Sequence, residues 1–572
     1  MLILISIFLC LFIPLVMLIL HLVRPRFNIQ GFLAVLAILA GWVLVFLARS
    51  ESPRSIPLLQ WQPGFLFIIS PSLLIDQSSW YFALALTSLA LTVIITSISQ
   101  LGQRPPPNLS SGQPSPAAEE LASGDSASSD QSAPATAIPN AQDWVLWAQF
   151  LAVNGLGLVA VTAGNLLTLM LAWTALDLIE LPILLGQMMQ SRTRERIVLA
   201  FSAKMAGVCL VLGAGIILWS SGTSLLFDSI TQPAGTLLLL AAGLRLGVIP
   251  IHLPFTRGLP INRNLATMLR LVPAAASYIL LVRLSAVGVF EPLTPYLLGL
   301  TIFTGIYAGI NWLRARDEIV GRPFWLLTTA SLVVAAAILH QPAACLAWGI
   351  ASLLSGGFVF SMSLRHKSLV PLAILGIINL SALPFTPTWQ ATTLYAPSSI
   401  SGQNPTIFAI FSFLLLLIQA FLMSGFIRHV LRGISLANNA ISPQAERWVW
   451  FLYPVGLAFL VLTHLLIGLF MLPKLPGVPV VGWFVGAVVV IFVGAIHFLG
   501  RQSRYLFQPR IDPNFRSIWD RIFAFEWLYR ILWMLYRSLS RVFGLISSVL
   551  EGEGGLLWAL VLFGLIFVFL QR

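Results

Sequence analysis

The amino-acid sequence predicts an all-α polytopic membrane protein, and three observations lead to that prediction. Of its 572 residues, 58% are hydrophobic and only 9% are charged, far less charge than a soluble chain of this length carries. Apolar runs of about 20 residues, long enough to span a bilayer as a helix, recur along nearly the whole chain. Basic residues gather in alternate short loops, so the net charge of +12 indicates membrane orientation and not nucleic-acid binding.

Hydropathy predicts about sixteen membrane spans. The first, 1–23, has no basic leader and no small-residue cleavage site, so we expect it to be retained. The others lie near 31–48, 79–99, 145–163, 166–187, 197–219, 236–252, 265–286, 293–313, 323–340, 342–362, 368–385, 405–430, 448–472, 479–499 and 555–571.

The loop charges predict an orientation with the N-terminus outside. In that orientation most loop cations lie on the inner side, and the outer 386–404 loop has none. Arg49, Arg54 and Lys474 are the main exceptions. The inner-side cations are Arg24, Arg26, Arg192, Arg194, Arg196, Arg257, Arg263, Arg314, Arg316, Arg322, Arg365, Lys367, Arg428, Arg432, Arg501 and Arg504.

Two segments depart from this pattern of spans. Residues 102–142 are rich in Pro, Ser, Ala, Gln and Asp without apolar periodicity, so we expect a disordered inner-side linker, and a docking role for it stays open. Within 501–553, apolar residues recur at helical spacing with arginines between them. This segment is predicted to lie along the inner membrane surface as an amphipathic helix before the last span, 554–572.

The sequence indicates no cofactor or metal site in this chain. Cys10, Cys209 and Cys345 lie far apart in apolar runs, with neither metal-ligand spacing nor a disulfide framework. The sequence has no GxGxxG motif at a strand–helix junction, no histidine pairs for haem and no hydrolytic triad. We therefore expect any electron transfer to occur in partner subunits.

The most unusual stretch runs from Leu237 to Leu284. It begins as a span with Arg245 well inside the apolar run, is interrupted by glycines and by Pro250, and continues through His252 to a helix that carries Arg270. A cation at bilayer depth is costly and usually faces a bundle interior or a water-filled path, where broken helices are also tolerated. The stretch predicts a transport-type centre; a packing kink with a snorkelling arginine is the alternative.

Within this stretch, Leu244–Phe255 reads LRLGVIPIHLPF. It resembles the sequence A-K-S-A-Q-F-P-L-H-W-L-P of the antiporter-like membrane subunits of respiratory complex I, a family that includes Mrp-type cation/proton antiporter and membrane-bound hydrogenase subunits. Arg245 stands at the family's buried lysine, and Pro250 and His252 match its proline and histidine. Further similar places are Leu74-Ile75-Asp76 with Ser79, Leu171-Ala172-Trp173, Ala200-Phe201, Gly207, Gly213, Gly222-Thr223, Val282-Arg283-Leu284 and Leu383-Pro384-Phe385.

The resemblance implies two inverted five-helix repeats, each with a broken helix, at Pro250 and Pro384. The implied organisation is N-terminal spans in 1–101, the linker 102–142, a first repeat in 143–287, a second repeat in 288–432, two spans in 433–500, a lateral helix in 501–553 and a last span in 554–572.

Several departures from the family pattern concern titratable residues. Thr174 stands where the fifth helix of the family carries a glutamate, and Leu269, beside Arg270, stands where the eighth carries a histidine. The region 342–362 is uncharged where the family has a lysine or histidine, and Gln419 is the main polar side chain of the next long span. The second half of an ion path is therefore predicted to be depleted.

An unpaired arginine at bilayer depth is costly, so we hypothesise that Asp177 or Glu180, which share one helix face, pairs with Arg245. Alternatively, both carboxylates lie near the inner mouth and serve the arginines of 191–196. Arginine does not release its proton, so Lys204 and His252 are the cationic groups that could titrate. Alternatively, Lys204 extends to the inner surface and His252 has only a structural role. The candidate ion-path residues are Asp177, Glu180, Lys204, Arg245, His252 and Arg270.

The sequence thus predicts a membrane subunit of a complex I-type energy-converting assembly that contributes to proton or cation translocation. Its expected partners are other membrane subunits of a complex I-like or Mrp-like assembly, the lipid bilayer, and protons or Na⁺. The expected location is a prokaryotic inner membrane. A non-pumping structural subunit with the same fold and a standalone secondary transporter stay open as alternatives.

Overall fold

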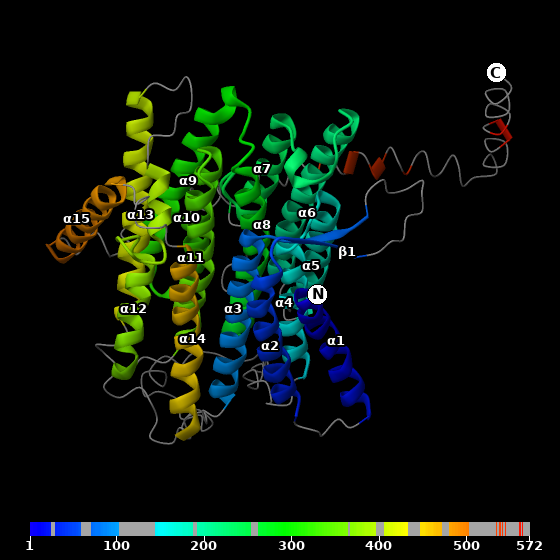
Figure 1. Cartoon of the computed structure of the whole chain (residues 1–572), viewed down its shortest axis with the longest axis horizontal. Helices are drawn as coiled ribbons and strands as arrows, with labels where there is room; N and C mark the ends of the chain where they lie inside the picture. The colour runs from blue at the N-terminus through cyan, green and yellow to red at the C-terminus, as the bar shows by residue number, and fades with distance from the viewer. Residues whose placement is uncertain are drawn as a thin grey trace, which may run out of the picture. The chain divides into compact units, whose positions relative to one another are not determined.

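A computed structural model of the chain confirms the all-helical polytopic fold. It describes residues 1–23, 29–58, 70–101, 144–186, 191–252, 261–363, 366–395, 405–432, 447–471 and 480–502, with scattered residues between 534 and 563. The chain forms two compact units, Met1–Pro509 and Arg510–Arg572. All the elements discussed below belong to the first unit (Figure 1).

Each of the first fifteen predicted spans contains one helix. Thirteen helices in the described residues are long and apolar enough to cross a membrane. The predicted last span and amphipathic helix lie outside the described residues apart from scattered positions. The helices are α1 Leu2–Val23, α2 Gln30–Leu47, α3 Gln77–Leu101, α4 Trp144–Val161, α5 Leu166–Gly186, α6 Ser191–Ser220, α7 Gln232–Leu246, α8 Arg263–Leu284, α9 Thr294–Arg314, α10 Glu318–Ile338, α11 Pro342–Ser361, α12 Val370–Leu380, α13 Pro405–Leu431, α14 Arg447–Met471 and α15 Val480–Gln502.

Two predicted full-length spans, 236–252 and 368–385, are shorter helices. Helix α7 ends at Leu246 because Gly247 adopts the left-handed conformation, with φ of 78°, and its N–H caps the last turn. Helix α12 ends at Leu380, four residues before Pro384. In both places the helix ends before the proline, because a residue with positive φ, Gly247 or Ala382, follows the last turn.

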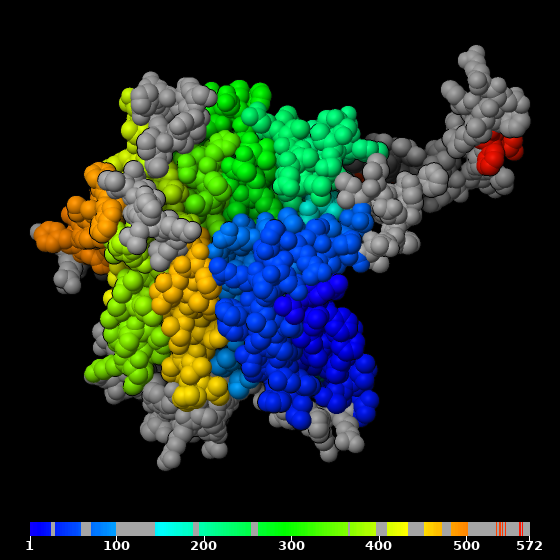
Figure 2. Space-filling model, viewed as in Figure 1, coloured from blue at the N-terminus to red at the C-terminus, as the bar shows by residue number. Residues whose placement is uncertain are grey.

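The most buried helices form the centre of the first unit. Helices α3, α8, α10 and α11 are enclosed, and α8 packs against α3, α4, α7, α10 and α11. Helices α1, α2 and α15 expose apolar side chains, as lipid-facing helices do. Figure 2 shows α14 beside the N-terminal helices, and it contacts α3. Helix α8 is therefore at the middle of the buried part of the first unit.

A polar contact fixes α8 against α3. The side-chain Nδ2 of Asn264 donates to Ser97 Oγ at 2.6 Å, to Thr96 Oγ1 at 3.1 Å and to the carbonyl of Val93 at 3.2 Å. Asn264 is fully buried, so these bonds satisfy its donors in a place without water. They determine how α8 faces its neighbours.

A two-stranded ribbon, which the hydropathy pattern does not predict, precedes α3. Strands β1 (Arg54–Pro57) and β2 (Ser72–Ile75) pair antiparallel. Isolated bridges join Leu73 to Ala163 and Asn165 to Leu226, so the ribbon connects to the α4–α5 and α6–α7 turns. Asp76 and Ser79 then cap the start of α3 reciprocally, at 2.7 and 2.9 Å.

Candidate ion-path site

Four charged side chains meet between α5, α6 and α7, and we call them the charge cluster: Asp177, Glu180, Lys204 and Arg245. None of the four residues is more than 7% exposed. Two acids and two bases give a net charge of zero when all are ionised, which limits the cost of burying them. A fifth charged residue, Arg270 on α8, lies within electrostatic range of Glu180.

Arg245, in the last turn of α7, binds Asp177 through both arms of its guanidinium. The Nη1–Oδ2 and Nη2–Oδ1 distances are 2.6 and 2.9 Å. Nη1 also donates to the Lys204 carbonyl at 3.2 Å, and the guanidinium carbon lies 4.3 Å from the centre of the Trp173 ring. The hypothesis that Arg245 pairs with a carboxylate of α5 is confirmed, and the partner is Asp177.

Lys204, from α6, pairs with the second carboxylate. Its Nζ lies 2.5 Å from Glu180 Oε2 and 4.0 Å from Asp177 Oδ1. The sequence alternative of a lysine that snorkels toward the inner surface is wrong, because the side chain is only 6% exposed. These bonds also favour the buried pairing over carboxylates that serve the arginines of 191–196.

Close packing holds α6 against α7 at this point. A methyl group on Gly207 would lie 2.8 Å from Arg245 Cγ and 3.2 Å from the Ala241 carbonyl. Only glycine therefore lets the arginine stem pass between the helices. The glycine at position 207, one turn after Lys204, is therefore explained by this close packing of α6 and α7.

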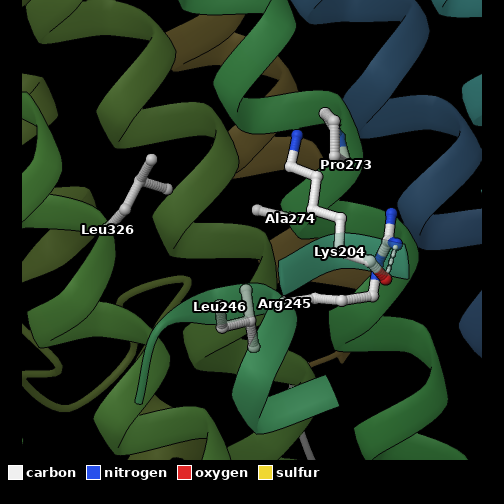
Figure 3. A pocket seen from close by; sticks show the side chains of 6 residues that line it. All are labelled: Lys204, Arg245, Leu246, Pro273, Ala274 and Leu326. Atoms are coloured by element: carbon white, nitrogen blue, oxygen red, sulfur yellow. Dashed lines mark hydrogen bonds between the residues drawn. The ribbon is translucent and has the colours of Figure 1, made fainter. Parts of the chain in front are cut away.

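A small cavity adjoins Lys204 and Arg245, with room for about one water molecule. Its lining residues are Lys204, Arg245, Leu246, Pro273, Ala274 and Leu326 (Figure 3). Figure 3 shows the bond from Arg245 to the Lys204 carbonyl at its edge. The cavity connects the charge cluster to α8 and α10.

The other sequence candidates lie near the cluster or at the helix breaks. Arg270, on α8, is 8% exposed and within electrostatic range of Glu180. His252 Nδ1 is 2.9 Å from the Pro250 carbonyl, which ties the ring to the break after α7. Pro384 follows the end of α12, remote in sequence from the cluster. No group of three or more His, Cys, Asp or Glu in the described residues could hold a metal ion.

The loop-charge pattern assigns Arg322 to an inner loop, and the structure corrects this. It lies within α10 and is 1% exposed, with its guanidinium carbon 5.0 Å from the Phe360 ring centre. Arg263, also assigned to a loop, begins α8 and pairs with Glu318 at 2.7 Å. The packing of α8 against α10 and α11 encloses these two side chains, which the sequence alone does not indicate.

No family model and no curated protein matches the chain. A chain of the Mrp complex from Dietzia sp. DQ12-45-1b is similar with a TM-score of 0.63 and 13% identity, over 99% of this chain and 63% of that one. A chain of the membrane-bound sulfane sulfur reductase (MBS), an archaeal respiratory membrane complex, gives 0.61 and 16%, over 98% and 100%. A chain of respiratory complex I from Thermus thermophilus with bound aureothin gives 0.55 and 16%, over 82% and 98%.

The chain has the fold of an antiporter-like membrane subunit. It spans 63% of the length of the Dietzia chain and nearly all of the other two. At these identities the likeness is one of fold, and function depends on the site that this chain builds. The implied repeat boundaries, 143–287 and 288–432, stay a prediction.

In the second half of this antiporter-like fold, the described buried groups are mostly neutral. Helix α11 is enclosed and has no charged residue. Tyr395 donates its hydroxyl to Gln419 Oε1 at 2.6 Å, and both side chains are buried. Arg428 binds the Leu313 carbonyl near the end of α13. Apart from Arg322 on α10, the acidic, lysine and arginine residues that are buried among the described residues lie in the first half.

Proposed function

We propose that this chain is a membrane subunit of a complex I-type energy-converting assembly, in a prokaryotic inner membrane, and that it contributes to proton or cation translocation. The fold it shares with chains of three multi-subunit membrane complexes supports the assembly. The single observation that carries the translocation is the buried charge cluster beside the break of α7. Buried ionisable groups within membrane spans mark ion and proton pathways.

In this proposal the two ion pairs have different roles. Arg245 stays protonated, so its ion pair with Asp177, held by two hydrogen bonds, does not change during transport. Lys204 and Glu180 are in 2.5 Å contact and exchange a proton. When a further proton binds to Glu180, the neutral carboxyl group attracts the Lys204 ammonium less strongly. Lys204 Nζ, 4.0 Å from Asp177, then moves toward that carboxylate, and the adjoining cavity provides a water to carry the proton.

The test is ion flux in proteoliposomes, with the protein purified together with any partners. Lys204→Met and Glu180→Gln should each reduce proton or Na⁺ flux by about 100-fold or more, the effect of removing a proton-transfer group. Lys367→Met and Glu195→Gln remove the same charges from exposed positions and should leave flux unchanged. Size-exclusion profiles check that assembly is intact. Unchanged flux in both cluster variants would refute the path.

A second candidate function is a structural subunit that keeps the fold without pumping. The uncharged α11 and the neutral Tyr395–Gln419 pair favour it, because protons need titratable groups or water along the way. Wild-type protein that assembles with partner subunits but conducts no ion would support this function. Flux from a protein that purifies alone would instead support a standalone transporter.

A further inference from the structure

Three arginines converge where α8 and α10 begin, and we call them the arginine cluster: Arg263, Arg270 and Arg322. Arg263 and Arg270 are seven residues apart on α8, so they lie on one face of that helix. Arg322 lies on α10, which packs against α8, and is within electrostatic range of both. Arg270 and Arg322 are buried and Arg263 is partly exposed, and three like charges close together repel each other unless anions offset them.

The carboxylates near the arginine cluster already have other partners. Glu318 binds Arg263, which also donates to carbonyls at the end of α11. Glu180 binds Lys204. Asp317, half-buried, accepts the Val320 N–H as the cap of α10.

Arg322 itself has unused donors. Its Nε and Nη2 atoms are buried and have no hydrogen-bond partner among the described residues. The ring of Phe360, 5.0 Å away, offers a weak contact but accepts no such bonds. A buried arginine with unmet donors and a like-charged neighbour is a costly arrangement without a further group.

We propose that a small inorganic anion binds between Arg322 and Arg270. Such an anion accepts the unused N–H groups of Arg322 and offsets the repulsion between the two arginines. A water molecule would accept hydrogen bonds but bring no negative charge to the two arginines. At 1% exposure Arg322 is too enclosed for a lipid headgroup, which restricts the ligand to a small ion.

The site adjoins the cavity of the charge cluster. Leu326, one turn after Arg322, and Pro273 and Ala274, one turn after Arg270, line that cavity. The proposed site therefore lies about one helical turn from the cavity along both α8 and α10. The inference stands apart from the proposed translocation, because binding is measured without any flux.

The test is equilibrium binding of radioactive chloride to the purified full-length protein in detergent, with inorganic phosphate as competitor. We expect saturable chloride binding that Arg322→Gln weakens by about 10- to 100-fold, the loss of one or two charged hydrogen bonds. Arg316→Gln, which removes an exposed arginine from the same segment, should bind as wild type. Phosphate that displaces chloride with higher affinity would identify an oxyanion as the preferred ligand of the same site.

A second measurement uses only the wild-type protein, in case Arg322→Gln does not fold. Chloride should raise the unfolding temperature saturably above that in gluconate at equal ionic strength, because ligand binds the folded state. Absence of saturable binding and equal unfolding temperatures in chloride, phosphate and gluconate would overturn the proposal. Binding that is equally strong in a folded Arg322→Gln variant would also overturn it.

Discussion

Replacing Asp177 with asparagine should be among the most damaging single changes in the membrane region. The substitution keeps the shape of the side chain but removes the charge that Arg245 faces at 2.6 and 2.9 Å. Both side chains are nearly inaccessible, 2% for the arginine and 0% for the aspartate, so water cannot replace the carboxylate. We expect a loss of about 3–5 kcal/mol in the free energy of unfolding, the usual cost of removing one partner of a buried ion pair.

The opposite substitution, Arg245→Met, should cost less. With Arg270 included, Asp177→Asn leaves three cations facing Glu180 alone, whereas Arg245→Met leaves two cations and two carboxylates. Lys204, already 4.0 Å from Asp177, moves in to bind it. We therefore expect a cost of about 1–3 kcal/mol, the size of the lost hydrogen bonds.

The assay is equilibrium unfolding in mixed micelles with increasing SDS, followed by tryptophan fluorescence, for wild type, both single variants and the double variant. The coupling energy of this cycle should be about 2 kcal/mol or more, since the residues are in direct contact. Thr174→Ala, one turn from Asp177 on α5, is the control for general disturbance of the helix. A cost below about 1 kcal/mol for Asp177→Asn, as for an exposed pair, would refute the reasoning.

Three further variants test other parts of the fold. Gly207→Ala should displace Arg245 through the 2.8 Å approach of its new methyl group, and should lower flux while the protein still assembles. Asn264→Ala should cost about 1–3 kcal/mol in SDS unfolding, because it removes three buried hydrogen bonds between α8 and α3. Tyr395→Phe should cost about 1–2 kcal/mol by leaving Gln419 unpaired, yet should not change flux; a fall in flux would place this neutral pair in the path.

The helices were predictable because hydropathy depends mainly on each residue's own transfer free energy. The ends of α7 and α12 were not, because a single left-handed turn at Gly247 decides where α7 stops, and the proline three residues later is the stronger sequence signal. The β1–β2 ribbon was missed for a related reason. Four-residue strands are too short to show a reliable alternation of polar and apolar residues.

The site was predictable where burial alone required a partner. Arg245 stands deep in an apolar run, so a carboxylate on a neighbouring helix had to be close, and Asp177 lay at a suitable depth. The partner of Lys204 and the burial of Arg322 were not predictable. Lys204 lies near the middle of α6 and Arg322 in the first turns of α10. For both residues, only the rotation and packing of the helix decide between an inward side chain and one that reaches the surface.

The β1–β2 ribbon gives the bundle one stiff end. Its backbone bonds to the α4–α5 turn, that turn bonds to the α6–α7 turn, and Arg283 at the end of α8 binds the Ala163 carbonyl. Loops that are joined by hydrogen bonds in this way move together as a rigid unit. A rearrangement within the charge cluster is therefore expected to tilt the helices about the end that the ribbon holds. Its largest displacement would then occur at the opposite ends of α5, α6 and α8, the side from which Arg263 and Arg322 enter the membrane.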